Sequence, residues 1–256
     1  MNEILLTFDV EEFDLPLEYG IPISIEEQMK VGKKGLDAIN EIFEDPDIRC
    51  TLFTTAAFAS QFPESIVHLS KKHEIASHTY YHSSFQKDDL KNSRLVLEKI
   101  TSQKVFGLRM PRMKKIDAVW IQEAGYKYDS SVNPTWIPGR YNNLTKPRTM
   151  YKECGFPKIP VSVSPNFRIP LFWLAFKNFP YSYFKRLALQ TLKKDQYLSL
   201  YFHPWEFTDL NDYKLPWMTK KKSGTELLDR LKRFLEEMKN EGHFITMNSF
   251  LNKKII

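Results

Sequence analysis

The stretch ILLTFDVEE, residues 4–12, decides how the rest of the chain is interpreted. Its apolar, β-branched and aromatic residues, uninterrupted by Gly or Pro, predict a buried strand over Ile4–Asp9. Asp9 and Glu11 stand at its end, and side chains two positions apart in an extended chain point to the same face. One carboxylate of such a pair can bind a metal ion while the other accepts a proton. The alternative is a strand-to-loop junction with solvated acids, because more acids follow.

Two later stretches have the same form, an apolar strand that ends in ionisable residues. HEIASHTYYH, residues 73–82, predicts a strand followed by His78 and His82, and LSLYFHPWEF, residues 198–207, predicts a strand ending at His203. On a helical turn, side chains four positions apart share one face, so the first two imidazoles could bind one divalent metal ion. Such a site needs at least a third protein ligand, and the acidic pair is the candidate. Surface histidines are common, so the pair alone does not establish a metal site.

Strands and helices alternate along most of the chain. Further strands are predicted over Thr51–Thr55, His73–Ser77, Val105–Arg109, Tyr126–Ser131, Tyr197–His203 and Phe244–Met247. Helices are predicted over Ile25–Phe43, Pro63–Leu69, Asp88–Ile100, Ile116–Ala124, Tyr181–Lys194 and Thr225–Asn240. Successive β/α units of this kind indicate an α/β fold with a parallel sheet, whose sites form at the carboxyl ends of the strands. No internal repeat is visible, and we expect a single domain over residues 1–256.

The stretch 133–170 differs from the rest because it contains seven prolines. Proline at this density excludes long helices. We expect a long irregular excursion or insertion with short strands, one of them over Lys158–Val163. Loops of this length are usually functional.

Two more strands end in residues that could assist a site at this edge of the sheet. Arg109 could orient a carboxylate by bidentate hydrogen bonding, and Asp129 could orient an imidazole. His203 could act as a general acid. The alternatives are a structural surface arginine and a turn or cap aspartate.

The composition limits the class of protein and its partners. The net charge of +6 fits an acidic partner or a membrane surface, but the lysines are scattered and no nucleic-acid-binding motif appears, so we expect no nucleic acid. Cys50 and Cys154 show neither metal-ligand spacing nor a disulfide framework. The start of the chain lacks the features of a signal peptide, and we expect a cytoplasmic protein. The apolar segment Leu171–Phe184 could line a cleft or lie peripherally against the inner membrane.

The motifs together resemble those of a known family. TFDVEE (7–12), SHTYYH (77–82), LRMP (108–111), YDSS (128–131) and YFHPWEF (201–207), in this order, are similar to the five motifs of polysaccharide deacetylases of the NodB-homology type, carbohydrate esterase family 4. The resemblance covers about Ile4 to Phe207. The first motif is most similar to the branch that has FDVE.

The resemblance implies a distorted (β/α) barrel of about seven strands. It also implies that Asp9 is the catalytic base and His203 the general acid, and that Arg109 and Asp129 tune these two groups. The implied activity is metal-dependent removal of N-acetyl groups from an amino sugar in a polysaccharide or a lipid-linked glycan precursor.

The resemblance further implies that His78 and His82 are ligands of one divalent metal ion, with Zn²⁺ preferred and Co²⁺, Ni²⁺ or Mn²⁺ as alternatives. The chain departs from the family pattern because Val10 stands where a second acid usually follows the first. The third ligand is then expected to be Glu11, with Glu12 as the alternative.

A second departure is Arg112, which stands where the family often has an aromatic residue. It could alter a sugar subsite or attract an acidic glycan. Two other functions stay open. The chain could be an amidohydrolase of the same fold that acts on a small non-sugar amide, with or without a metal, or a non-catalytic glycan-binding relic.

Overall fold

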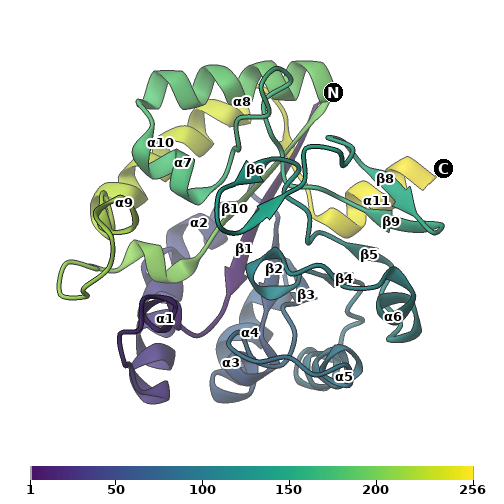
Figure 1. The fold of residues 1–256 in the computed structure, drawn as a ribbon, viewed down its shortest axis with the longest axis vertical. Coiled ribbons are helices and arrows are strands. Elements are labelled where there is room, and N and C mark those ends of the chain that lie inside the picture. Colours follow the sequence, from purple (N-terminus) through teal and green to yellow (C-terminus); the bar gives the residue numbers. More distant parts are fainter. Residues whose placement is uncertain (1, 256) are drawn as a thin grey trace.

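The computed structural model describes residues 2–255, and its main sheet is built around the predicted first strand (Figure 1). The order is β10-β1-β2-β3-β4-β5-β9-β8, and β11 pairs with the start of β1. The strands are β1 (Glu3–Val10), β2 (Cys50–Thr54), β3 (Glu74–Ser77), β4 (Gly107–Leu108), β5 (Tyr128–Asp129), β8 (Tyr151–Glu153), β9 (Phe156–Lys158), β10 (Tyr197–Phe202) and β11 (His243–Phe244). All neighbours are parallel except β8 and β9. The parallel strands place their carboxyl ends at one edge of the sheet.

The sheet curls until its two sides meet. After β9 the chain continues between β5 and β10: the Ile159 N–H donates to the Asp129 carbonyl at 2.9 Å, and the Ser162 N–H donates to the Ser199 carbonyl at 2.9 Å. The result is a distorted β/α barrel, as the family resemblance implied. In place of the predicted strand Lys158–Val163, β9 ends at Lys158 and an irregular segment continues.

Helices cover the outside of the sheet. Figure 1 shows α7, α8 and α10 together above the sheet in this view, and α3, α4, α5 and α6 following one another below it. They are α1 (Ile25–Ala38), α2 (Asn40–Glu44), α3 (Ala56–Gln61), α4 (Pro63–Ser70), α5 (Asp89–Thr101), α6 (Ala118–Glu123), α7 (Trp173–Asn178), α8 (Tyr181–Asp195), α9 (Trp217–Lys220) and α10 (Thr225–Lys239). Three short 3₁₀ helices, η1 (Leu15–Tyr19), η2 (Pro111–Met113) and η3 (Pro204–Phe207), follow strands β1, β4 and β10.

A last helix, α11 (Met247–Ile255), closes the barrel at the end where the strands begin. Its Met247, Phe250 and Leu251 are buried with Leu5 of β1 and Phe53 of β2. The predicted strand Phe244–Met247 is therefore wrong beyond Phe244. Thr246 accepts the Ser249 N–H through its hydroxyl at 3.2 Å, an N-cap contact that begins the helix.

Other boundaries differ for local reasons. The predicted helix Ile25–Phe43 is divided into α1 and α2 at Ile39, whose φ and ψ of −99° and 12° leave the helical range. Helix α3 was not predicted. The proline-rich stretch, all of which the structure describes, contains no helix and instead forms the hairpin of β6 (Trp136–Ile137) and β7 (Tyr141–Asn142), followed by β8 and β9.

The apolar segment Leu171–Phe184 is packed inward. Leu171, Phe176 and Phe184 are fully buried against the outer face of the sheet, while Phe172 and Trp173 line a cavity. Of its two expected roles, lining a cleft fits this placement. None of the described helices has the length and apolar character needed to cross a bilayer.

Candidate active site

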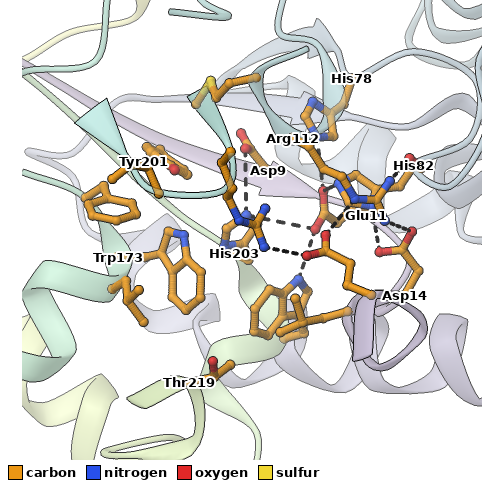
Figure 2. A pocket seen from close by; sticks show the side chains of 18 of the residues that line it. Asp9, Glu11, Asp14, His78, His82, Arg112, Trp173, Tyr201, His203 and Thr219 are labelled. Atoms are coloured by element: carbon orange, nitrogen blue, oxygen red, sulfur yellow. Dashed lines mark hydrogen bonds and ion pairs between the residues drawn. The ribbon is translucent and has the colours of Figure 1, made fainter. Parts of the chain in front are cut away.

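Five of the seven candidate residues line one cavity of about 200 Å³ at the carboxyl ends of the strands (Figure 2). Asp9 lies on β1 and Glu11 just after it, His78 directly follows β3, and His203 directly follows β10. All of these side chains and His82 line the cavity, as do the aromatic side chains of Tyr141, Phe172, Trp173, Tyr201 and Trp205. Parallel pairing therefore brings together residues that lie far apart in the sequence.

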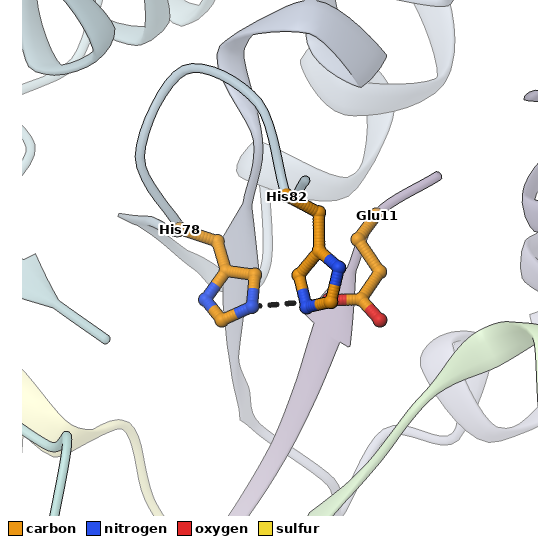
Figure 3. Close-up of side chains that lie close together, drawn as sticks. All are labelled: Glu11, His78 and His82. Carbon is orange, nitrogen blue, oxygen red and sulfur yellow. Dashed lines mark ion pairs between the residues drawn. The ribbon is translucent and has the colours of Figure 1, made fainter. Parts of the chain in front are cut away.

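Glu11, His78 and His82 converge on one point (Figure 3). The Glu11 Oε2 atom lies 3.0 Å from His78 Nε2 and 3.2 Å from His82 Nε2. All three side chains are buried. Two imidazoles and one carboxylate form a donor set that leaves positions open on a divalent ion, as catalytic zinc sites do.

Hydrogen bonds behind the two imidazoles fix which nitrogen faces Glu11. His78 Nδ1 lies 2.8 Å from the Arg109 carbonyl, and His82 Nδ1 lies 2.7 Å from Asp14 Oδ1. Because these oxygens can only accept, each Nδ1 carries a hydrogen and each Nε2 is left to meet Glu11. Glu11 Oε2 is buried without a hydrogen-bond donor. A divalent cation would satisfy these converging atoms, so the residues fit a metal site.

The electrostatics of the three residues agree with this fit. Burial alone would raise the pKa of Glu11, but His82, His203 and His78 hold that pKa well below its usual range. Burial opposes protonation of His82, yet Glu11 and Asp14 raise the pKa of its imidazole to about 9. Metal binding at His82 Nε2 would displace that proton.

Glu12, the alternative ligand, points elsewhere. Its Oε2 accepts from the Thr55 hydroxyl at 2.6 Å, and burial raises the pKa of its carboxyl group. Glu11 Oε1 accepts from the Trp205 indole N–H at 3.1 Å, which holds its carboxylate toward the two histidines.

We expected the two histidines to lie on a helical turn. They lie instead on an irregular loop. Thr79 has a φ of 66°, in the left-handed region that β-branched residues rarely adopt. The loop is fixed to the start of α3, since the Ala56 and Ala57 N–H groups donate to the Thr79 and Tyr80 carbonyls at 3.0 and 2.9 Å. Convergence of the imidazoles thus depends on tertiary contacts.

Asp9 and Arg109 form a buried ion pair in the floor of the site. Arg109 Nη1 donates to Asp9 Oδ1 at 2.6 Å and to the Thr7 hydroxyl at 2.9 Å, while its Nη2 donates to the Ser130 hydroxyl at 3.0 Å. The guanidinium also lies over the Phe53 ring, 4.0 Å from its centroid. Asp9 Oδ2 remains free of this pair and lies 3.9 Å from His203 Nε2.

His203 is oriented by Glu206, a residue that the sequence analysis did not single out. Glu206 Oε1 accepts from the His203 backbone N–H at 2.8 Å and lies 3.1 Å from His203 Nδ1. Burial opposes protonation, but Glu11, Glu206 and Asp9 raise the pKa of His203. The signal was available, because a carboxylate three positions after a helix N-cap commonly returns to the N-cap backbone.

Two expected site residues do not line this cavity: Arg109 lies beneath it and pairs with Asp9, whereas Asp129 is held elsewhere. Its Oδ1 accepts from the Ser131 N–H at 2.9 Å, and its Oδ2 accepts from Lys158 Nζ at 2.7 Å. It lines a neighbouring cavity. Asp14, which contacts His82, was also missed, since it lies 68 positions away in sequence.

Comparison with known proteins matches the two halves of the chain to two family models. Residues 2–128 match the family model of the polysaccharide deacetylases. These residues, about half of the chain, belong to the polysaccharide deacetylase family. Residues 130–252 match a domain of unknown function, DUF3473, and β5 pairs with β9 across the junction of the two matches. No curated protein matches the chain.

Solved structures share the fold of this chain at low sequence identity. A protein from Mycobacterium smegmatis assigned as a polysaccharide deacetylase is 16% identical, with a TM-score of 0.65 over 98% of this chain and 89% of that one. The PuuE allantoinase is 15% identical, with a TM-score of 0.63 over 96% and 88%. A carbohydrate esterase family 4 pseudoenzyme from Bacillus anthracis is 12% identical, with a TM-score of 0.51 over 96% and 63%. These likenesses concern the fold.

Proposed function

We propose that the protein is a metal-dependent hydrolase that removes N-acetyl groups from an amino sugar of a glycan. The observation that carries the proposal is the convergence of Glu11, His78 and His82 beside Asp9 and His203. A hydrolytic site needs a polarising group, a base and an acid within reach of one bond, and these five side chains offer all three functions.

Glu11, His78 and His82 would hold one divalent ion, with Zn²⁺ preferred because the donor set has two imidazoles and one carboxylate. Bound there, the ion would polarise the acetyl carbonyl and favour ionisation of a water molecule. The carbonyl of Arg109 and the carboxylate of Asp14 hold the two imidazoles in the ligand orientation.

Asp9 is the proposed base. Its Oδ1 is held by Arg109, while Oδ2 faces the cavity side on which His203 lies and can accept the proton of the attacking water. The ion pair with Arg109 holds the carboxylate in this orientation.

His203 is the proposed acid. Its Nδ1 is engaged by Glu206, so Nε2 is the atom that can donate a proton to the departing amine nitrogen. The raised pKa of His203 keeps its imidazolium populated for this step.

The cavity supports a sugar as the substrate. Its volume of about 200 Å³ accommodates a single ring, and Tyr141, Trp173 and Trp205 offer flat faces beside the site. Aromatic faces of this kind pack against the apolar faces of pyranose rings. A small amide would also fit this volume, so the amidohydrolase alternative is tested alongside.

The deciding experiment measures acetate release from chito-oligosaccharides by the full-length protein, before and after chelation and after addition of Zn²⁺. We expect release that stops on chelation and returns with the metal. A small ureide serves as the alternative substrate. Hydrolysis of the ureide without acetate release, or release unaffected by complete metal removal, would contradict the proposal.

A further inference from the structure

A second cavity of about 280 Å³ adjoins the one that holds Glu11 and the histidine pair. The two cavities share four lining residues, Arg112, Met113, Arg140 and Tyr141. Figure 2 shows Arg112 close to Asp14 and His82, so this shared wall begins directly beside the metal-ligand group. A glycan with one sugar in the first cavity would therefore place a neighbouring sugar in the second.

The lining of the second cavity is strongly basic. Its cationic side chains are Arg112, Lys114, Lys115, Arg140, Lys146 and Lys158, and its anionic side chains are Asp129 and Glu153. A cleft lined mainly by one sign of charge raises the local concentration of ligands of the opposite sign.

Both carboxylates of this cavity are neutralised by lysines. Asp129 Oδ2 lies 2.7 Å from Lys158 Nζ, and both side chains are buried. Glu153 lies 2.6 Å from Lys146 Nζ and 3.5 Å from Lys158 Nζ. Neither carboxylate is free to repel an anion, and Asp129 acquires a role in this cavity instead of beside His203.

The arginines of the shared wall are balanced separately. Arg112 contacts Asp14 at 2.8 Å and Glu18 at 2.6 Å, and Glu18 also pairs with Arg140. Lys114 and Lys115 are exposed, and among the described residues neither has a carboxylate partner within 4.0 Å. The excess positive charge of the cavity therefore comes from these two lysines.

We propose that the second cavity is a subsite for an anionic substituent, a carboxylate or a phosphate, on the sugar next to the N-acetylated one. This inference rests on the proposed function for the first cavity. Lys114 and Lys115 contact the anion as mobile point charges. The side-chain amide of Asn143 donates one hydrogen to the Asn133 carbonyl and can offer its second to the anion. The substrate is then an acidic glycan.

The test is equilibrium binding by titration calorimetry, with a His203→Gln background to suppress turnover. A hyaluronan tetrasaccharide, which carries carboxylates beside N-acetylglucosamine, is compared with chitotetraose, which is neutral. N,N′-diacetylchitobiose 1-phosphate, whose phosphate lies on the sugar next to an N-acetylglucosamine, is compared with N,N′-diacetylchitobiose. We expect roughly three- to tenfold tighter binding of the anionic ligand in at least one pair, and weaker preference at 1 M salt. The pair that shows the preference identifies the carboxylate or the phosphate as the natural anion.

The double substitution Lys114→Glu and Lys115→Glu should abolish the preference while chitotetraose binds as before. The matched control is Lys91→Glu with Lys99→Glu, two exposed lysines of α5 that line neither cavity and change the net charge equally. Equal affinity for charged and neutral ligands, or equal weakening by both double variants, overturns the subsite. If the wild type itself releases no acetate, the same titrations run on it directly, so failure of the proposed activity leaves this outcome readable.

Discussion

Arg109 donates from Nη1 to Asp9 Oδ1 at 2.6 Å, and both side chains are buried beneath the active-site cavity. Among the described residues, Asp9 is the only carboxylate that forms an ion pair with Arg109. Asp9 is also the proposed catalytic base. Stability and catalysis are coupled at this position, and substitutions of Asp9 must be chosen with that in mind.

Asp9→Ala should both inactivate and destabilise the protein, whereas Asp9→Asn should mainly inactivate it. Removing one partner of a buried ion pair costs roughly 3–5 kcal/mol, because the remaining charge stays uncompensated. Asparagine keeps an acceptor for Arg109 but cannot act as the base, which should lower turnover about 10²- to 10⁴-fold. Urea unfolding and acetate release measure the two effects. An Asp9→Asn variant with wild-type turnover would exclude Asp9 as the base.

Glu206→Gln should lower kcat more than it changes KM, by roughly 10- to 100-fold. The glutamine side chain would keep an acceptor for the His203 backbone N–H, but the charge that raises the pKa of His203 would be gone. Because the acid must be protonated, activity is lost as pH rises through the pKa of His203. That limb of the kcat profile should therefore move to lower pH in the variant. An unshifted limb with normal folding would show that Glu206 does not act through His203.

His78→Ala and His82→Ala should each abolish stoichiometric binding of a divalent metal. Each substitution removes one of the three atoms that converge at 3.0–3.2 Å. Elemental analysis of protein dialysed against Zn²⁺ provides the measurement. His68→Ala is the matched control, because His68 is an exposed histidine paired only with Glu44 among the described residues. Equal zinc content in all three variants and the wild type would place the metal elsewhere.

The sequence was sufficient for the framework of the site and insufficient for its supporting contacts. Apolar runs that end in Asp9, His78 and His203 predicted the strands, and parallel pairing alone brings such ends together. By contrast, nothing in the sequence predicts the positive φ of Thr79, because β-branched residues rarely adopt this conformation. It results from hydrogen bonds to α3, a helix that the pattern of the sequence did not reveal.

Partners far apart in sequence account for most of what was missed. Asp129 was expected beside an imidazole, but it pairs with Lys158 at the end of β9. This contact depends on the path of the proline-rich stretch. Glu206, only three positions from His203, takes the expected place through a local 3₁₀ turn. Local hydrogen-bonding preferences could have predicted the second arrangement, whereas the first required the fold.

His73→Gln should reduce the loss of stability that the protein suffers between pH 7 and pH 5. Burial, opposed by the Phe43 carbonyl, lowers the pKa of His73 to about 4, from an ordinary value of 6.5. The Cys50 N–H donates to its Nδ1 at 3.1 Å, so the neutral ring is the form that fits.

Between these two pKa values the unfolded chain binds the proton and the folded chain does not, so stability falls as pH falls. For the wild type this single group should contribute a loss of about 2 kcal/mol between pH 7 and pH 5. Glutamine does not titrate there, and urea midpoints at both pH values measure the difference. His243→Gln, at an exposed position, controls for the loss of a histidine. A decline as steep in His73→Gln as in the wild type would show that His73 is not the group responsible.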